Sequence, residues 1–390
     1  MTDRVYLDWN AGAPMRASVV ARLSDSLGRT GNASSVHEEG RRARAAVEAA
    51  RRSVAALVGA NPRGVTFTSG GTESAVTVLS PQWFHGGRPL AFDRLLVSAV
   101  EHPAVARGGR FPADAVETVP VDRDGVVDLG ALDGRLAALA ADGRRALVSL
   151  MLANNETGVI QPVAEAARIA HGHGAMLHTD AVQAVGRIPV DAGALGADVL
   201  TLSAHKIGGP QGIGAIVRAN DLVAVPPLLT GGGQEGQARA GTENTWGIEG
   251  FGVAATEAAH DLKAMAAVAE RRDRIEAAVL DTAPEAVVFG AGAARLPNTL
   301  AVAVPGLSAE TALIAFDLAG VALSSGSACS SGKVAASAVL LAMGVPTDLA
   351  RCALRISIGP ATTDADVARF AEVFKKVHAD LTKRRGSRAA

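Results

Sequence analysis

The sequence predicts an α/β protein, in which a large domain is built on a mostly parallel sheet flanked by helices and a smaller domain is α+β. Two observations predict this class. Short apolar runs alternate with helical patterns, which is typical of a parallel sheet covered on both faces. Five of these runs are followed directly by a polar residue or a glycine pair. Open α/β sheets bind ligands at the carboxyl ends of their strands.

The expected elements of the large domain follow in chain order. Residues 38–58 have the pattern of a helix, with a narrow apolar stripe and Gly59 as its stop. We expect strands at residues 65–68, 95–100, 146–152, 175–179, 198–203 and 215–218. After the first five strands come, in order, Gly70-Gly71, His102, Asn155, Asp180 and His205-Lys206. We therefore expect these residues to converge at one edge of the sheet.

The pattern changes near residue 260, which indicates a second domain. A long helix is expected at 255–279, followed by a strand at 298–304, a helix at 309–318 and a strand at 354–358. The basic, alanine-rich tail at 375–390 has the composition of a frayed helix end. We predict an N-terminal segment of the small domain (1–15), a large cofactor-binding domain (16–261) and a small C-terminal domain (262–390).

Composition limits the classes of function. The 390 residues, 48% of them hydrophobic, are enough for two cores. A net charge of −1 argues against a bulk nucleic-acid or anionic-membrane binder. Two cysteines form no disulfide framework and fit a reducing compartment. Without a signal-peptide pattern or an apolar run of membrane-spanning length, the chain is predicted to be a cytoplasmic enzyme.

The two cysteines have different surroundings. Cys329 lies in Ser324-Ser325-Gly326-Ser327-Ala328-Cys329-Ser330-Ser331-Gly332, a small, polar stretch that cannot pack as a core. A structural cysteine normally lies among apolar side chains, so Cys329 is predicted to react, and residues 325–334 are predicted to be weakly ordered. Cys352 lies in an apolar pattern and is expected to pack in the core.

Lys206 and Asp180 are the first candidates for chemistry. Lys206 ends an apolar strand, where a lysine is costly unless functional, and could form a Schiff base with a carbonyl. Its alternative is a surface lysine at a strand exit. Asp180 could keep a pyridine nitrogen protonated, with Gln183 one helical turn further on the same ligand. The alternative for Asp180 is a helix N-cap.

Further candidates surround them. Gly70-Gly71-Thr72 follows a strand and opens a helix, which suits a phosphate, and Ser203 and His205 could add donors; many strand–helix turns look similar. His102 could stack on an aromatic cofactor or carry protons, or be structural. Arg355, in an apolar strand, suits a substrate carboxylate or an internal ion pair.

Other polar residues receive simpler interpretations. His171 and His173 stand beside glycines, with no thiol or carboxylate cluster near them in the sequence, so they indicate a helix stop and no metal site is predicted. A solvated helix face accounts for five arginines: Arg41, Arg42, Arg44, Arg51 and Arg52.

Lysine, aspartate, phosphate turn and histidine together describe a pyridoxal-phosphate site. The chain resembles the cysteine desulfurases, pyridoxal-phosphate-dependent enzymes of the class-V aminotransferase type, and within them the housekeeping and nitrogen-fixation group. The resemblance spans nearly the whole chain in order, on these motifs: Tyr6-Leu7-Asp8-Trp9-Asn10-Ala11, Gly31-Asn32-Ala33-Ser34-Ser35-Val36-His37, Thr68-Ser69-Gly70-Gly71-Thr72-Glu73-Ser74, Asn154-Asn155-Glu156-Thr157-Gly158, His178-Thr179-Asp180-Ala181-Val182-Gln183, Ser203-Ala204-His205-Lys206, Gly231-Gly232-Gly233-Gln234-Glu235, Arg239-Ala240-Gly241-Thr242-Glu243-Asn244, Ser324-Ser325-Gly326-Ser327-Ala328-Cys329 and Leu354-Arg355-Ile356-Ser357.

The resemblance implies the fold of pyridoxal-phosphate-dependent transferases and a role for each matching position. Lys206 would hold the cofactor as a Schiff base, His102 would stack on its ring and assist proton transfer, and Cys329 would take the substrate sulfur as a persulfide. The implied cofactor contacts are the ring nitrogen with Asp180, the ring hydroxyl with Gln183 and Asn155, and the phosphate with Gly71, Thr72, Ser203, His205 and, from the partner subunit of a homodimer, Thr242. The implied contacts of the cysteine substrate are Arg355, Asn155 and Asn10.

The implied reaction turns L-cysteine into L-alanine and passes the sulfur to an iron–sulfur scaffold or another acceptor protein.

Two positions depart from many relatives. Gly12-Ala13 precedes Pro14 where two threonines are common, which removes two hydroxyls near the expected substrate opening and bears on fine substrate preference. Gly71 replaces an alanine, a harmless change in a turn.

Two rival readings stay open. An aminotransferase or selenocysteine lyase could use the same scaffold; a transaminase has no use for Cys329, and a lyase would tolerate its loss. A catalytically idle sulfur-carrier or assembly subunit would require erosion of the lysine, aspartate or arginine, all of which are present.

Overall fold

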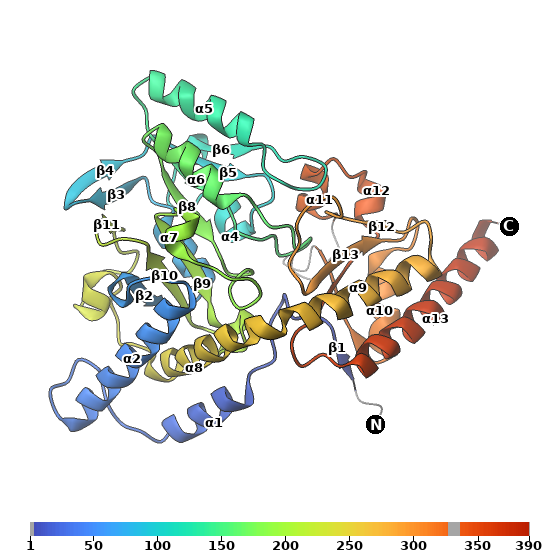
Figure 1. The fold of residues 1–390 in the computed structure, drawn as a ribbon, viewed down its shortest axis with the longest axis horizontal. Helices are drawn as coiled ribbons and strands as arrows, with labels where there is room; N and C mark the ends of the chain where they lie inside the picture. Colours follow the sequence, from blue (N-terminus) through green and yellow to red (C-terminus); the bar gives the residue numbers. More distant parts are fainter. Residues whose placement is uncertain (1–3, 327–335, 390) are drawn as a thin grey trace.

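The computed structural model describes residues 4–326 and 336–389. Figure 1 shows two lobes, with the larger sheet and most of the first 260 residues in one and the C-terminal elements in the other. The chain has an α/β fold, with a mostly parallel sheet flanked by helices in the larger lobe and an α+β arrangement in the smaller one, as predicted. Within the described ranges, no helix is both long enough and apolar enough to span a lipid bilayer.

A seven-stranded sheet forms the centre of the larger lobe, in the order β2-β10-β9-β8-β7-β5-β6. Neighbouring strands from β9 to β6 run parallel, and β10 is antiparallel to both β2 and β9. Since β2 and β9 therefore point the same way, β2, β5, β7, β8 and β9 end at one edge. The strands are β2 (Val65–Thr68), β5 (Arg94–Ser98), β6 (Val116–Val119), β7 (Ala146–Ser149), β8 (Met176–Asp180), β9 (Val199–Ser203) and β10 (Gly214–Arg218).

Helices cover this sheet and bury its apolar side chains. The amphipathic α2 packs on α8, and α6 packs on β8. A small sheet, β11-β3-β4, lies at the margin. The elements are α1 (Ala17–Ser26), α2 (Glu38–Leu57), α3 (Gly71–Val78), β3 (Gln82–His85), β4 (Arg88–Ala91), α4 (Pro103–Ala106), α5 (Leu129–Ala141), α6 (Val163–Gly172), α7 (Ala192–Leu195), β11 (Val223–Ala224) and α8 (Thr245–Asp261). As predicted, α2 ends just before Gly59, whose φ of 62° suits glycine.

The smaller lobe has its own sheet and core. Its antiparallel sheet has the order β12-β13-β16-β15, and a parallel pair joins β1 to β14. The phenyl rings of Phe316, Phe370 and Phe374 stack between α10 and α13. The elements are β1 (Val5–Tyr6), α9 (Met265–Thr282), β12 (Val287–Val288), β13 (Thr299–Ala303), α10 (Ala309–Leu318), β14 (Val321–Ala322), β15 (Ser324–Ser325), α11 (Ala338–Ala342), α12 (Thr347–Ala350), β16 (Ala353–Ser357) and α13 (Asp364–Ala389).

Two expected features are wrong. The single helix at 255–279 is two helices, α8 and α9, separated by a 3-10 turn at Leu262–Ala264. α8 packs on α1 and α2, whereas α9 packs on α13, so the chain bends as it passes between the lobes. Asp180 does not begin a helix: residues 181–187 form turns, in which Ala184 and Val185 donate to the carbonyl of Ala181.

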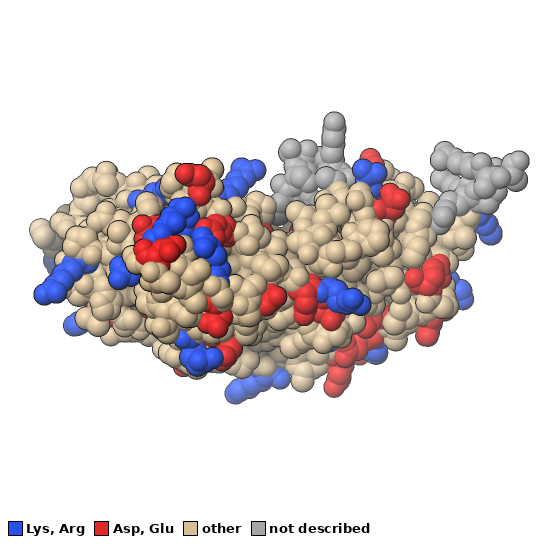
Figure 2. Space-filling model, turned by 90° about the horizontal axis from the view of Figure 1, so that it is seen from above, with Lys and Arg blue, Asp and Glu red and all other residues tan. Residues whose placement is uncertain are grey.

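Charged side chains of both signs intermingle over the described part of the face in Figure 2. This agrees with the balance of 38 basic and 39 acidic residues. The electrostatic surface therefore offers no reason to expect long-range attraction of a polyanion to this face.

Candidate active site at the strand ends

A cavity of about 330 Å³ lies where the strands end, between the two lobes. We call it the strand-end cavity. It contains residues from all five expected strand ends, together with the N-terminal segment and β16 of the smaller lobe. Its lining includes eleven of the predicted site residues: Asn10, Gly71, Thr72, His102, Asn155, Asp180, Gln183, Ser203, His205, Lys206 and Arg355.

The phosphate turn opens the cavity at the end of β2. Gly70 precedes α3 with a φ of 155°, and no side chain caps this helix. The first N–H groups of a helix have no intrahelical partner, so they are available to an anion. A Cβ on Gly71 would lie 3.3 Å from Val182 Cγ2 and 3.6 Å from Ser203 Cβ, so an alanine there would slightly crowd the turn.

Lys206 brings an amine into the cavity. It ends a short 3-10 turn, Ala204–Lys206, directly after β9. Its Nζ donates to the carbonyl oxygens of Asn10 at 2.6 Å and Ala11 at 3.0 Å. Lys206 is partly buried and lines the cavity, which favours a functional lysine over a surface lysine.

Asp180 supplies a partly buried carboxyl to the same cavity. Burial raises its pKa to about 6, while the N–H of Val182 and the charge of Lys206 act in the other direction. Glu101 lies nearby, also buried: burial raises its pKa well above the usual value, and the charge of Asp180 adds to this. Met151 donates its N–H to Glu101 Oε1 at 2.6 Å, while Oε2 has no partner among the described residues.

The two histidines of the cavity favour their neutral forms. His102 begins α4, where its Nδ1 accepts from the N–H of Ala104 at 3.1 Å, so a neutral ring carries its proton on Nε2. Burial and the charge of Lys206 lower the pKa of His102. Burial, followed by the charges of Lys206 and Arg187, lowers the pKa of His205 to about 4. A neutral imidazole can donate a hydrogen bond from one ring nitrogen and accept one at the other without placing a charge in the cavity.

Arg355 and Asn10 connect the cavity to the smaller lobe. Arg355 is 3% exposed; its Nη2 donates to Asp8 at 2.8 Å and its Nη1 to the carbonyl of Asn155 at 3.0 Å, while Nε has no partner among the described residues. The alternative of an internal ion pair is therefore partly correct. The carboxamide of Asn10 bonds the carbonyl of Asn155 and the side chains of Thr299 and Asn298, so its main-chain carbonyl is the group that holds Lys206.

Two predicted site residues are not in this lining. Cys329 and most of the segment predicted to be weakly ordered lie outside the described residues; Ser325, just before them, pairs with Leu354 of β16. Thr242 is exposed in the loop before α8 and does not line the strand-end cavity. Cys352 is buried as predicted, 5% exposed in an apolar cluster.

The Gly12-Ala13 departure leaves an open hollow beside the cavity, lined by both residues and by His205. A Cβ on Gly12 would lie 3.8 Å from His205 Nδ1, an ordinary contact. Ala13 donates its N–H to the carbonyl of His205 at 2.9 Å. The positions where relatives commonly carry two threonines, 12 and 13, are thus adjacent to His205, one of the predicted phosphate ligands.

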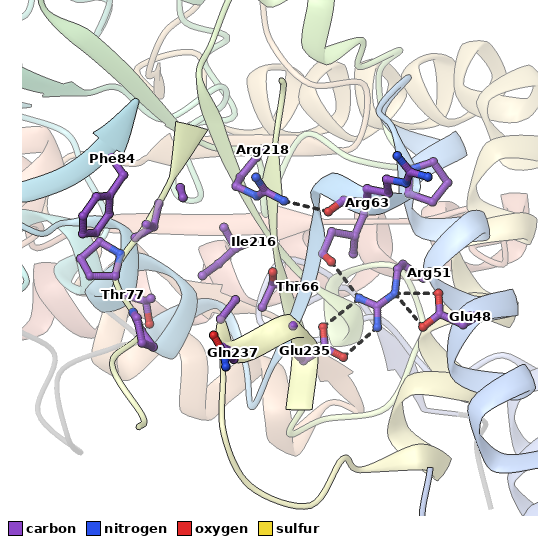
Figure 3. A pocket seen from close by; sticks show the side chains of 18 of the residues that line it. Glu48, Arg51, Arg63, Thr66, Thr77, Phe84, Ile216, Arg218, Glu235 and Gln237 are labelled. Carbon is purple, nitrogen blue, oxygen red and sulfur yellow. Dashed lines mark hydrogen bonds and ion pairs between the residues drawn. The ribbon is translucent and has the colours of Figure 1, made fainter. Parts of the chain in front are cut away.

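A second, larger hollow of about 610 Å³ lies beside β2, and we call it the arginine hollow (Figure 3). Its central group is Arg51, which is 8% exposed, so its assignment to the solvated helix face is wrong. Arg51 is buried because Glu235, from a loop far along the chain, accepts from both of its terminal nitrogens at 2.8 Å. Arg51 also donates to the carbonyl of Val65, and Glu235 accepts from the N–H of Phe67. The pair therefore occupies the outer edge of β2.

The loop that carries Thr242 is fixed at a second point. Arg239 forms an ion pair with Glu73, with Nε 3.0 Å from Oε1. Glu73 also accepts from the N–H of Ser69, in the phosphate turn, at 2.8 Å. Hydrogen bonds from Arg239 and Ser69 lower the pKa of Glu73 although burial opposes this. One ion pair thus joins the Thr242 loop to the phosphate turn.

Several buried polar residues near the site were not singled out from the sequence: Glu101, Glu156, His178 and Arg187. Glu156 accepts from Ser337 at 2.5 Å, and burial raises its pKa to about 7. His178 joins Ser149 and Thr201 across three strands, and burial lowers its pKa to about 3. Glu156 and His178 lie inside the quoted motifs, which was the available signal for them, whereas Glu101 and Arg187 lie outside these motifs. The burial of such residues depends on packing that local patterns do not reveal.

His171 and His173, at the end of α6, each lie against a separate carboxylate. His171 Nε2 lies 3.0 Å from Asp198, and His173 Nε2 lies 2.7 Å from Asp133. His173 is the residue that ends α6, which agrees with the helix-stop interpretation. Within the ranges that the structure describes, no three metal-ligating side chains come together.

Comparison with known proteins decides the family. The model of the aminotransferase class-V family matches residues 5–370. A cysteine desulfurase of Sinorhizobium fredii is 42% identical over 392 residues, covering 98% of each chain, and one of Gluconacetobacter diazotrophicus is 43% identical, covering 97% of this chain and 94% of its own. The chain belongs to the cysteine desulfurase family. The solved structure of a NifS-like protein from Rickettsia africae, 31% identical, matches with a TM-score of 0.84 over 96% of this chain and 99% of its own.

Cysteine desulfurases use pyridoxal phosphate, and the strand-end cavity fits this group. A lysine amine, a partly buried carboxyl and an uncapped helix N-terminus line one cavity, as an aldehyde, a pyridine nitrogen and a phosphate require. Gly71 and Thr72 are the first residues of that helix and both line the cavity, so its free N–H groups are available to a phosphate there.

Proposed function

We propose that the protein is a cysteine desulfurase that converts L-cysteine to L-alanine and retains the sulfur as a persulfide on Cys329. The observation that carries this proposal is the meeting of Lys206, Asp180 and Arg355 in one cavity. An amine for a carbonyl, an acid for a ring nitrogen and a guanidinium for a carboxylate are the groups that an amino-acid substrate and pyridoxal phosphate need.

The cofactor would be held by residues of the strand ends. When bound, pyridoxal phosphate supplies an electron sink for the carbon next to the substrate carboxylate. Lys206 would carry it covalently, Asp180 would bind the ring nitrogen, and His102 would stack on the ring. Asn155 and Gln183 would contact the ring hydroxyl, and the phosphate would be bound by Gly71, Thr72, Ser203 and His205.

The substrate would be oriented from the smaller lobe. Arg355 has a buried Nε without a partner among the described residues, and we propose that it binds the cysteine carboxylate with Asn155. Asn10 supports this arrangement through the carbonyl that accepts from Lys206. His102 and Lys206 would move protons to and from the substrate carbons and the sulfur that is transferred.

Cys329 would complete the reaction as a thiolate nucleophile. Its sulfur attacks the substrate sulfur, so that an S–S bond forms while the C–S bond of cysteine breaks, and the substrate carbon takes a proton to become the methyl group of alanine. The persulfide would then pass to an iron–sulfur scaffold or another acceptor protein.

We further propose that the enzyme works as a cytoplasmic homodimer in which Thr242 of one subunit reaches the phosphate of the other. Exposure of Thr242 and its distance along the chain from the phosphate turn support this proposal. A division into residues 1–15 with 262–390, and 16–261, agrees with separate apolar clusters on either side of the strand-end cavity.

The test is an assay of purified protein supplied with pyridoxal phosphate and L-cysteine. We expect alanine and sulfide in equal amounts in the presence of a thiol reductant. Cys329→Ala should still bind cofactor and cysteine but lose roughly 10³-fold in alanine formation, because the attacking thiolate is missing. Unchanged alanine formation by this variant, on cysteine or selenocysteine, would favour the lyase and refute the persulfide step.

A further inference from the structure

Arg187 is a buried cation next to the strand-end cavity that the reaction outlined above does not use. It lies seven residues after Asp180 in the chain and is 6% exposed. Its Nη1 donates to the main-chain carbonyl of Gln183 at 2.6 Å and also to the Gln183 side-chain oxygen, and its Nη2 reaches the carbonyl of Trp9 at 3.5 Å. Among the described residues, no carboxylate forms an ion pair with it. Burial, with the charge of Arg355, lowers its pKa to about 9, so it stays charged at neutral pH.

A buried guanidinium without a carboxylate is costly, so its place requires a reason. Arg51 illustrates the usual solution, a bidentate pair with Glu235. Arg187 instead directs its charge at a side chain that lines the strand-end cavity, Gln183. The buried charge of Arg187 therefore lies next to Gln183, the residue predicted to contact the ring hydroxyl.

Arg187 also determines which way the Gln183 carboxamide faces. A guanidinium has only donors, so the Gln183 oxygen must face it. On the other side, Gln183 Nε2 donates to the carbonyl of Asn10 at 3.0 Å, and a carbonyl only accepts. Both neighbours require the same orientation. One N–H of the amide group is used by Asn10, and the described residues offer the second N–H no acceptor.

We propose that Arg187 is a positioning residue: it fixes Gln183 as a hydrogen-bond donor to the strand-end cavity, so that the site stabilises an oxygen anion on the bound ligand. This inference rests on the proposed function, in which that oxygen is the ring hydroxyl of pyridoxal phosphate. An N–H donor and a nearby positive charge both favour the deprotonated oxygen. Five other charged or titratable side chains line the same cavity as Gln183: His102, Asp180, His205, Lys206 and Arg355. Two more lie behind them, because Asp8 pairs with Arg355 and the charge of Asp180 acts on Glu101.

The test is a pH titration of the visible absorption of bound pyridoxal phosphate, which reports proton loss from the cofactor rather than turnover. Relative to the unmodified protein, Arg187→Met should raise the midpoint by about one pH unit, since a nearby favourable charge is removed. Arg187→Lys keeps the charge but loses the two-point hold on Gln183, and should raise it by about half a unit. Cofactor affinity, measured by equilibrium dialysis, should fall about three- to tenfold in Arg187→Met.

Two comparisons make the test specific. When Gln183 is already alanine, Arg187→Met should shift the titration midpoint by less than about half of the shift that it causes in the unmodified protein, because the effects of residues that act as a unit are not additive. Arg110 provides the matched control. It too is a partly buried arginine whose guanidinium donates to carbonyls, those of Thr77, Pro226 and Pro227, but it does not line the strand-end cavity. Arg110→Met should leave the midpoint unchanged.

The inference is overturned if Arg187→Met and Arg187→Lys bind cofactor with the midpoint of the unmodified protein, or if they lose cofactor while the bound fraction titrates normally. If Arg187→Met does not fold, the Lys variant alone decides in the same way. Failure of the unmodified protein to develop visible absorption with pyridoxal phosphate would refute the proposed function itself, a different result from a normal spectrum that Arg187 variants do not change.

Discussion

The strand-end cavity and the arginine hollow handle charge in opposite ways. In the larger arginine hollow, Arg51 is bound by Glu48 and Glu235, and each carboxylate neutralises it directly. Around the smaller strand-end cavity, Lys206 and Arg187 donate to carbonyl oxygens and Asp180 accepts from a main-chain N–H, while Arg355 pairs with Asp8. The charge of Arg51 is balanced within the first region, whereas Lys206, Asp180 and Arg355 of the second region line a common space.

This difference shows that chemistry, rather than size, identifies the functional site. Internally neutralised groups stabilise the fold and have little to offer a ligand. Groups whose pKa is displaced by burial, and which face one cavity, are typical of an active site. Two results would contradict this comparison. One is a substitution in the strand-end cavity that changes only the free energy of unfolding, and the other is a substitution in the arginine hollow that changes only turnover or the cofactor spectrum.

The largest expected effect is that of Lys206→Ala. Loss of the amine should remove the covalent attachment of the cofactor and the proton carrier together, reducing alanine formation roughly 10⁴-fold. The purified variant should lose the yellow colour of the bound cofactor. The measurement is the rate of alanine formation together with the visible spectrum, and activity within tenfold of the unmodified protein would remove Lys206 from the mechanism.

Glu235→Gln probes the arginine hollow. Arg51 would remain buried without its main counter-charge, so the free energy of unfolding should fall by about 3 kcal/mol or more. Arg369 and Glu372, an exposed pair on α13, provide the control: Glu372→Gln should cost about 0–1 kcal/mol. Denaturant unfolding at fixed protein concentration measures both. A shift of the cofactor's spectral midpoint in Glu235→Gln, without a loss of stability, would contradict the contrast between the two regions.

His178 predicts an acid dependence of stability. Its folded pKa of about 3 lies below the value of about 6.5 for a free histidine, so the unfolded chain takes up a proton first as the pH falls. Its contribution to stability is complete above pH 6.5 and is lost progressively down to about pH 3, about 2 kcal/mol by pH 5. His178→Asn should lose less stability between pH 8 and pH 5 than the unmodified protein. The exposed His260→Asn is the control, and equal acid sensitivity of all three proteins would rule out His178 as the cause.

The smallest expected effect is that of Cys352→Ala. Its Sγ lies against the carbonyl of Asp348 at 3.3 Å in an apolar cluster, away from the strand-end cavity. Removing the sulfur should cost roughly 1 kcal/mol of stability through lost packing and leave turnover unchanged. A kinetic defect comparable to that of Cys329→Ala would mean that the two cysteines had been assigned to the wrong roles.

Much of the site was predictable because strand ends are marked locally. Alternating apolar runs predicted β2, β5, β7, β8 and β9, and the rule for open α/β sheets brought the residues that follow them to one edge. The residues after these strands do line one cavity. Their roles stay predictions, and Cys329 lies outside the described residues.

The rest depended on partners that are distant in sequence. Arg51 follows the same helical spacing as its exposed neighbours, and its partner Glu235 is 184 residues away. The break between α8 and α9 has no glycine or proline to mark it, and arises where the two helices pack on different neighbours. Arg187 has no local feature that indicates burial. The burial of such residues follows from tertiary packing, so the local sequence does not predict it.

The central claim, that the strand-end cavity holds pyridoxal phosphate on Lys206, is tested most directly by trapping the bond. The purified protein is incubated with pyridoxal phosphate, reduced with borohydride and digested, and the modified peptide is identified by mass spectrometry. We predict one reduced adduct per chain, on the peptide that contains Lys206. An adduct on another lysine, such as Lys263 or Lys375, or no adduct at all, would contradict the account.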